Sequence, residues 1–355
     1  MAPTRNAAVI FNQVPTGYPE PGKTTVYDTT RTIDLDNVSL DGGVLLKIIV
    51  LSNDPYLRGK MYDARGVSST LGAPDVYALY ASPFHLGEPL SNYGVGRVLR
   101  SEDARLRVGD HVTGVLNFEE YAVVGRSSVS GLRKLENKEN LSWSAYVGAA
   151  GMTGRTAYYA YHEYAKAKKG DNIFVSSGAG AVGSQVIQLA KLDGLKVIGS
   201  AGSDDKVAYM KDIGADVAFN YKTTSTEDVL KKEGPLDVYW DNVGGSTLDS
   251  ALGHMKVNGR LLECGMISAY NTKEPYAFKN IMRIVSFSLS VHGFVELGLA
   301  DKWEEEFYRE YPALIASGKI KYREERSPFS QAGEAILRVQ MGDNVAKSVI
   351  VVEED

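Results

Sequence analysis

The sequence predicts an α/β protein of two domains, in which a doubly wound parallel sheet is inserted into a β-rich domain. First, beyond Leu141 short apolar runs alternate with amphipathic helical patterns, as in repeated βα units. Second, the apolar runs before Leu141 are short and are separated by Gly and Pro. Third, 355 residues exceed the usual size of one domain. We therefore expect one domain over 1–140 plus 318–355 and another over 141–317.

The β-rich domain is predicted from short runs with strand composition. These runs are Ala7–Phe11, Val44–Val50, Tyr93–Leu99, His111–Val115 and Glu120–Val124. The segment Leu57–Glu88 has weak periodicity, and we expect a long loop that lines a substrate site, because such loops often carry function. Val345–Val352 has the composition of a terminal strand that returns to this domain.

The second domain is predicted from alternating strand and helix patterns. Its expected strands are Ile173–Ser177, Lys196–Ser200, Val217–Asn220, Leu236–Asp241, Arg260–Gly265 and Ser286–His292. Its expected helices follow Val182–Ala190, Lys206–Ile213, Thr226–Lys232, Gly245–Met255 and Trp303–Ser317. Right-handed crossovers between such strands produce a parallel, doubly wound sheet.

Composition and charge argue against several classes of protein. The net charge is −5, and the densest basic run, Lys166, Lys168 and Lys169, suits a solvated helix C-terminus. We therefore expect no nucleic-acid partner and no anionic membrane surface. No apolar run approaches the roughly 20 residues that span a bilayer. The first residues lack the pattern of a signal peptide, which leads us to expect a cytoplasmic protein.

The sequence offers no spacing typical of metal ligands. It has one cysteine, Cys264, so a zinc lobe built on four cysteines is impossible. The five histidines are scattered along the chain. We therefore expect no metal, and without one the usual Lewis acid of alcohol oxidation is missing.

A glycine loop gives the strongest functional signal. Gly178-Ala179-Gly180-Ala181-Val182-Gly183 follows an apolar strand and opens an amphipathic helix. In this context the glycines allow a tight turn and the close approach of a dinucleotide pyrophosphate, which the helix N-terminus then binds. The alternative is a glycine-rich turn in a sheet that binds nothing.

The residues after the second strand indicate NADPH rather than NADH. NADH sites usually place an acid there to bind the ribose 2′-hydroxyl. Here the strand ends in Ile198–Ser203, without an acid, and is followed by Lys206. Tyr221 follows the third strand, and a lysine with a tyrosine suits a 2′-phosphate. Asp204 and Asp205 are a counter-signal, which the first turn of a helix would explain.

Several motifs together resemble the zinc-independent branch of the medium-chain dehydrogenase/reductase family. This branch holds NADPH-dependent 2-alkenal and other double-bond reductases and prostaglandin reductases (leukotriene hydroxydehydrogenases). The motifs are Asn53–Gly59, Gly94–Gly96, Val108–Val112, Gly151–Tyr158, the glycine loop, Gly199–Ser203, Phe219–Lys222, Tyr239–Gly245, Cys264–Asn271 and Gly342–Lys347. The chain departs from the family at Thr153, where proline is common, and at Ala346, where glycine is usual.

The resemblance implies a GroES-like catalytic domain, an inserted Rossmann domain, a cleft between them, and a homodimer. It implies that the cofactor contacts Met152, Thr153, Thr156, Gly202, Ser203, Lys206, Tyr221, Asn242, Cys264, Tyr270, Phe294 and Asn344, in addition to the glycine loop. It places Asn53 and Tyr56 at the substrate pocket. From its own position, Cys264 is expected to be a buried packing residue.

The expected reaction is reduction of the C=C bond of small α,β-unsaturated aldehydes or ketones by NADPH. Hydride addition to the β-carbon puts negative charge on the carbonyl oxygen, which needs a hydrogen-bond donor. Tyr270 follows a parallel strand at the end where such sheets bind ligands, and it is our candidate together with the nicotinamide ribose. The alternatives are a quinone reductase, an oxidant of secondary alcohols, and a non-enzymatic NADPH-binding protein.

Overall fold

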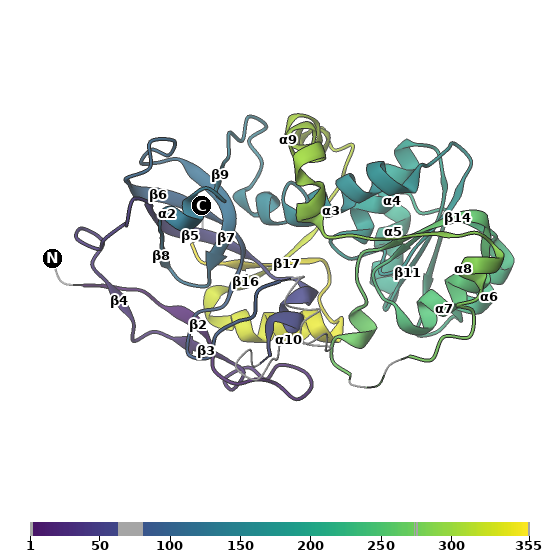
Figure 1. Cartoon of the computed structure of the whole chain (residues 1–355), viewed down its shortest axis with the longest axis horizontal. Helices are drawn as coiled ribbons and strands as arrows, with labels where there is room; N and C mark the ends of the chain where they lie inside the picture. The colour runs from purple at the N-terminus through teal and green to yellow at the C-terminus, as the bar shows by residue number, and fades with distance from the viewer. Residues whose placement is uncertain (1–2, 63–80, 273, 275, 354–355) are drawn as a thin grey trace. The chain divides into compact units, whose positions relative to one another are not determined.

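The computed structural model describes residues 3–62, 81–272, 274 and 276–353, which form two compact units (Figure 1). One unit comprises residues 1–148 and 324–355, and the other comprises residues 149–323. The predicted fold class, a β-rich domain with an inserted parallel α/β domain, is confirmed.

The second unit contains a parallel sheet in the order β12-β11-β10-β13-β14-β15. Its strands β11 and β14 are labelled in Figure 1. Its strands are β10 (Asn172–Val175), β11 (Lys196–Ala201), β12 (Val217–Asn220), β13 (Leu236–Asp241), β14 (Met255–Glu263) and β15 (Ser290–Gly293). The chain builds the sheet outward from β10 to β12 and then returns to add β13 beside β10. This is the doubly wound order, with its reversal between β10 and β13.

Helices cover both faces of this sheet. They are α3 (Met152–Ala160), the π-helical turn η4 (Tyr161–Ala165), α4 (Gly183–Leu192), α5 (Asp204–Asp212), α6 (Thr226–Glu233), α7 (Gly245–Gly253), α8 (Arg283–Ser286) and α9 (Ala300–Ala316). Two short 3₁₀ turns are η5 (Ile267–Ala269) and η6 (Glu296–Leu299). Phe174, Tyr239 and Leu261 pack with residues of α6 and α7 on one face. Gly199, on the opposite face, lies against Met210 of α5.

The first unit is built around an antiparallel sheet in the order β16-β17-β5-β6-β7-β9, with β8 also paired to β5. These strands are β5 (Val44–Ser52), β6 (Ser91–Ser101), β7 (His111–Asn117), β8 (Tyr121–Val124), β9 (Arg133–Lys134), β16 (Glu324–Pro328) and β17 (Lys347–Val351). Only β16 and β17 run parallel to each other among these described pairs. The predicted terminal strand is thus present as β17, which pairs with β5.

The rest of the first unit consists of short elements. They are β1 (Thr4–Arg5), β2 (Ala8–Phe11), β3 (Thr25–Asp28), β4 (Thr32–Ile33), η1 (Pro55–Lys60), α2 (Arg126–Val129), η3 (Trp143–Val147), η7 (Phe329–Gln331) and α10 (Ala332–Met341). Residues of β2, β5, β6 and α10 share one apolar core. Part of the predicted loop Leu57–Glu88, residues 63–80, lies outside the described residues, so the expectation that it lines a substrate site stays a prediction.

Two predicted strands of the second unit begin several residues from the expected position. The strand predicted at Arg260 already starts at Met255, because α7 ends at Gly253 and the chain extends at once. The strand predicted from Ser286 starts only at Ser290, because Arg283–Ser286 forms the short helix α8 and Ser288 takes a positive φ of 50°. Of the helices in the described residues, none is long and apolar enough to cross a membrane.

Candidate functional site

The carboxyl ends of β10 and β13 meet where the strand order reverses. In doubly wound sheets this reversal opens a crevice in which ligands bind. The glycine loop follows β10, and Asn242 follows β13. The structure therefore brings the glycine loop and Asn242 together at the carboxyl end of the sheet.

The glycine loop packs so tightly that side chains at its first and last glycines would clash. A Cβ on Gly183 would lie 2.4 Å from the carbonyl oxygen of Ser177, and one on Gly178 would lie 2.7 Å from Sδ of Met210. The amide of Gly178 donates to the carbonyl of Ser200, which ties the loop to β11. The loop then enters α4 at Gly183. This is the close turn that a bound pyrophosphate requires.

Asn242 links the two strand ends directly. Its Nδ2 donates to the carbonyl of Ser176 at 2.7 Å, and its Oδ1 accepts from Nε1 of Trp240 at 3.2 Å. Ser176 in turn donates through Oγ to the carboxylate of Asp241 at 3.0 Å. Sequence reasoning missed Ser176 and Asp241, because their importance depends on a pairing between strands 65 residues apart.

The end of β11 carries the residues expected to select NADPH. Ser203 caps α5, since its side chain accepts from the amide of Lys206, which puts Lys206 in the first helical turn. The ring of Tyr221 lies on Gly202, where an added Cβ would be 3.0 Å from its hydroxyl. Asp204 accepts a hydrogen bond from Nδ2 of Asn220. It lies in the first turn of α5, which is the place that explains an acid here without an NADH site.

A pair of carboxyl groups lies at the carboxyl ends of the neighbouring strands β13 and β14. Asp241 and Glu263 are register partners on β13 and β14. Burial, followed by the negative charge of Asp241, raises the pKa of Glu263 to about 8. Burial also raises the pKa of Cys264 to about 12, and both carboxyls add to that shift. Cys264 is therefore a thiol at neutral pH, which does not suit nucleophilic chemistry. The residue as a whole is only partly buried, so the expectation of a buried packing residue is wrong.

Tyr270 lies over the end of β14. It follows η5, and a Cβ added to Gly265 would be 2.8 Å from its hydroxyl oxygen. The missing side chain at Gly265 thus makes room for the Tyr270 hydroxyl. Phe294 follows β15 and makes an edge-to-face contact with Trp240 at 5.6 Å between ring centroids.

The start of α3 supplies the remaining candidates of this unit. Thr156 donates to the carbonyl of Met152 at 2.8 Å. Thr153 is 3% exposed, and its Oγ1 is buried without a hydrogen-bond partner among the described residues. Gly154 is required here, because a Cβ would lie 1.7 Å from the carbonyl oxygen of Ala149. A buried hydroxyl without a partner is costly unless a ligand satisfies it.

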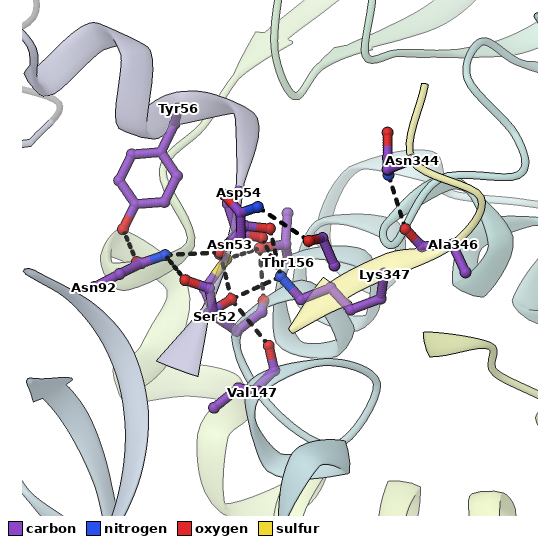
Figure 2. A network of polar contacts seen from close by, with 12 residues as sticks. Ser52, Asn53, Asp54, Tyr56, Asn92, Val147, Thr156, Asn344, Ala346 and Lys347 are labelled. Atoms are coloured by element: carbon purple, nitrogen blue, oxygen red, sulfur yellow. Dashed lines mark hydrogen bonds and ion pairs between the residues drawn. The ribbon is translucent and has the colours of Figure 1, made fainter. Parts of the chain in front are cut away.

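The candidates of the first unit, Asn53, Tyr56 and Asn344, lie on two segments (Figure 2). Asn53 follows β5 and donates through Nδ2 to Oγ of Ser348 at 3.0 Å. Tyr56 belongs to η1 and donates its hydroxyl to Oδ1 of Asn92. Asn344 precedes β17 and donates through Nδ2 to the carbonyl of Ala346 at 2.8 Å.

Within the described part of the chain, no group of three or more His, Cys, Asp or Glu side chains has an arrangement that would hold a metal ion. The expectation of a reaction without metal stays a prediction.

Comparison with known proteins decides the family. Residues 181–312 match the family model described as zinc-binding dehydrogenase, and residues 8–132 match the N-terminal domain of oxidoreductase. The chain belongs to the medium-chain dehydrogenase/reductase family. The predicted family is confirmed, and so is the prediction of an NADPH-dependent oxidoreductase.

Individual relatives match almost the whole chain. The NADP-dependent oxidoreductase RED1 of Cochliobolus heterostrophus is 36% identical over 99% of this chain and 98% of its own. The 2-alkenal reductase (NADP(+)-dependent) of Nicotiana tabacum is 34% identical over 99% and 98%. The crystal structure of CurA from Vibrio vulnificus in complex with NADPH matches with a TM-score of 0.84 and 28% identity, over 98% of this chain and 100% of that one.

Proposed function

We propose that this enzyme uses NADPH to reduce the C=C bond of small α,β-unsaturated aldehydes and ketones. The observation that carries the proposal is the Tyr270 hydroxyl, held over Gly265 at the ligand-binding edge of the parallel sheet. A hydroxyl at this edge is a donor suited to an enolate oxygen. The activity named for the tobacco relative, which matches 99% of this chain, supports the same reaction.

The residues at the sheet edge fit NADPH. The glycine loop can make its tight turn because Cβ atoms on Gly178 and Gly183 would collide with Met210 and Ser177, and such a turn lets the backbone approach a pyrophosphate closely. Lys206 and Tyr221 would hold the 2′-phosphate, with Gly202 and Ser203 forming the turn between them. Asn242, Cys264 and Phe294 would contact the ribose and nicotinamide region. Met152, Thr153 and Thr156 would border the nicotinamide, where Oγ1 of Thr153 would find the partner that it lacks.

The first unit would contribute the remaining ligand contacts. We assign Asn344 to the cofactor and Asn53 and Tyr56 to the substrate pocket. Asn53 has a free acceptor for this purpose, because its Oδ1 is buried without a partner among the described residues.

In the proposed mechanism, bound NADPH supplies a hydride to the β-carbon of the substrate. Tyr270 donates a hydrogen bond to the carbonyl oxygen as negative charge develops there, which stabilises the enolate. The α-carbon then takes a proton from the Tyr270 hydroxyl or from water, and solvent restores the phenol. Cys264 takes no part, because its raised pKa keeps it protonated.

A substrate panel tests this proposal against its alternatives. Purified enzyme without added metal is incubated with NADPH and a medium-length 2-alkenal, with NADPH and a quinone, and with NADP⁺ and a secondary alcohol. We expect NADPH oxidation with the alkenal and a saturated aldehyde as product. Turnover of the quinone or the alcohol with none of the alkenal would contradict the proposed reaction.

We also propose a homodimer formed at the β15 edge of the parallel sheet. Among the described residues, β15 has a strand partner on one side only, so its other backbone edge is open to pairing. Exposed apolar side chains lie on this strand and in the segment that precedes it: Val291 is 42% exposed, Met282 67% and Val285 71%. An open strand edge with apolar neighbours suits a second copy of the same edge, related by a two-fold axis.

A further inference from the structure

A buried ion pair joins the segment that carries Asn53 and Tyr56 to the segment that carries Asn344 (Figure 2). Nζ of Lys347 lies 2.5 Å from Oδ1 of Asp54, and each side chain is 4% exposed. Lys347 also donates to Oγ of Ser52 at 2.7 Å and to the carbonyl of Asn53 at 3.1 Å. All three ammonium protons therefore have acceptors, as a buried charge requires. The Asp54 carboxylate that pairs with this ammonium can only accept hydrogen bonds.

Asn92 connects this ion pair to Tyr56 through hydrogen bonds. It is fully buried, and its Nδ2 donates to Oδ2 of Asp54 at 3.0 Å and to the carbonyl of Ser52 at 2.8 Å. Both of these partners are acceptors without a proton. A flipped amide would direct Oδ1 at two acceptors, so the chemistry of the partners determines its orientation.

The direction of the Tyr56 hydroxyl follows from that orientation. Oδ1 of Asn92 faces the Tyr56 oxygen and can only accept, so the phenol must donate its proton to Asn92. The Tyr56 oxygen can then take part in any other hydrogen bond only as an acceptor. With this network intact, Tyr56 does not donate to an enolate oxygen.

We propose that Asn92 is a positioning residue, held by the Asp54–Lys347 ion pair, that fixes the Tyr56 hydroxyl as a hydrogen-bond acceptor in the substrate pocket. The inference rests on the proposed function, which places Tyr56 in that pocket. This role gives a reason for burying the Asp54–Lys347 ion pair, although removing both charges from water is unfavourable. It also leaves the donor role to a different residue, for which we propose Tyr270.

The test is a double-mutant cycle of Asn92→Ala and Tyr56→Phe, with the acceptor that the wild type reduces best. Each single variant should lower kcat/KM for the acceptor by about 3- to 10-fold, in the range for one hydrogen bond. The KM for NADPH should stay the same. In the Tyr56→Phe background, Asn92→Ala should have no further effect, because its partner hydroxyl is already gone.

Asn6→Ala is the matched control. Asn6 is also a buried asparagine of this unit, 5% exposed, and it exchanges two hydrogen bonds with the backbone of Tyr121. Its loss should affect stability and leave kcat/KM unchanged in both backgrounds. If Asn92→Ala does not fold, Asn92→Ser is used, which keeps a small polar side chain next to Asp54.

The outcomes separate the inference from the proposed function. Additive losses in the cycle, or a Tyr56→Phe variant with unchanged kcat/KM, would overturn the positioning role of Asn92. Failure of the wild type to reduce any alkenal would contradict the proposed function instead. The cycle would then be measured with the quinone that the enzyme reduces, and coupling there would still support the positioning role.

Discussion

At the scale of single residues, the reaction that we propose would depend on the hydroxyl of Tyr270. Tyr270→Phe should lower kcat by about 10- to 1,000-fold, because it removes one donor to the developing negative charge. The KM for NADPH should hardly change. Steady-state kinetics with a 2-alkenal measures both constants, and unaltered turnover would refute the role of Tyr270.

Two further variants sharpen this prediction. Gly265→Ala introduces a Cβ at 2.8 Å from the Tyr270 oxygen. This variant keeps the Tyr270 hydroxyl but should displace it, and kcat should therefore fall. Tyr276→Phe is the control, because Tyr276 is 41% exposed and bonds to Asp249. It should retain the kcat of the wild type.

We propose that Lys206 and Tyr221 set the preference for NADPH over NADH. Lys206→Ala should raise the KM for NADPH by about 10-fold or more, as expected for a lost hydrogen bond to a charged group, and leave that for NADH nearly unchanged. Lys211→Ala, at the other end of α5, should affect neither. Equal losses with both cofactors would argue against a 2′-phosphate site. Gly202→Ala should shift the preference in the same direction by displacing Tyr221.

At the scale of elements, the ends of β13 and β14 contain a pH-dependent contribution to stability. The pKa of Glu263 rises from 4.5 to about 8 on folding. Between these values the unfolded chain loses the proton while the folded chain keeps it, so the unfolded state binds fewer protons. The free energy of unfolding therefore falls as the pH rises through this window.

Thermal unfolding at about pH 5 and about pH 8.5 measures this effect. The Tm of the wild type should fall more than that of Glu263→Gln, because the glutamine cannot ionise. Glu334→Gln, an exposed glutamate on α10, should behave like the wild type. An identical fall in Glu263→Gln would show that this group does not contribute.

Elements with local signals were predictable from sequence, and those that depend on distant contacts were not. The glycine loop and the acidic first turn of α5 each lie within a few residues, so spacing alone predicts them. The helix α10 was missed. The Lys347–Asp54 pair joins residues 293 positions apart, and Asn92 reaches Tyr56 across 36 positions. Only the pairing of β5 with β6 and β17 brings those side chains together.

At the scale of the whole molecule, the open edge of β15 predicts the oligomeric state. Light scattering after size-exclusion chromatography should give twice the mass of one chain. Val291→Lys places a charge on the proposed interface and should yield monomers, whereas Val108→Lys, 70% exposed in the other unit, should remain dimeric. A monomeric wild type would rule out the interface.

In the reaction that we propose, hydride from NADPH goes to the β-carbon of an unsaturated carbonyl compound. The most direct test is turnover of a 2-alkenal with NADPH deuterated at C4, in the hydride position that the enzyme transfers, followed by NMR of the product. We predict a saturated aldehyde with deuterium on C3. Deuterium on C1 of an allylic alcohol would contradict the account, because it would show attack at the carbonyl carbon instead.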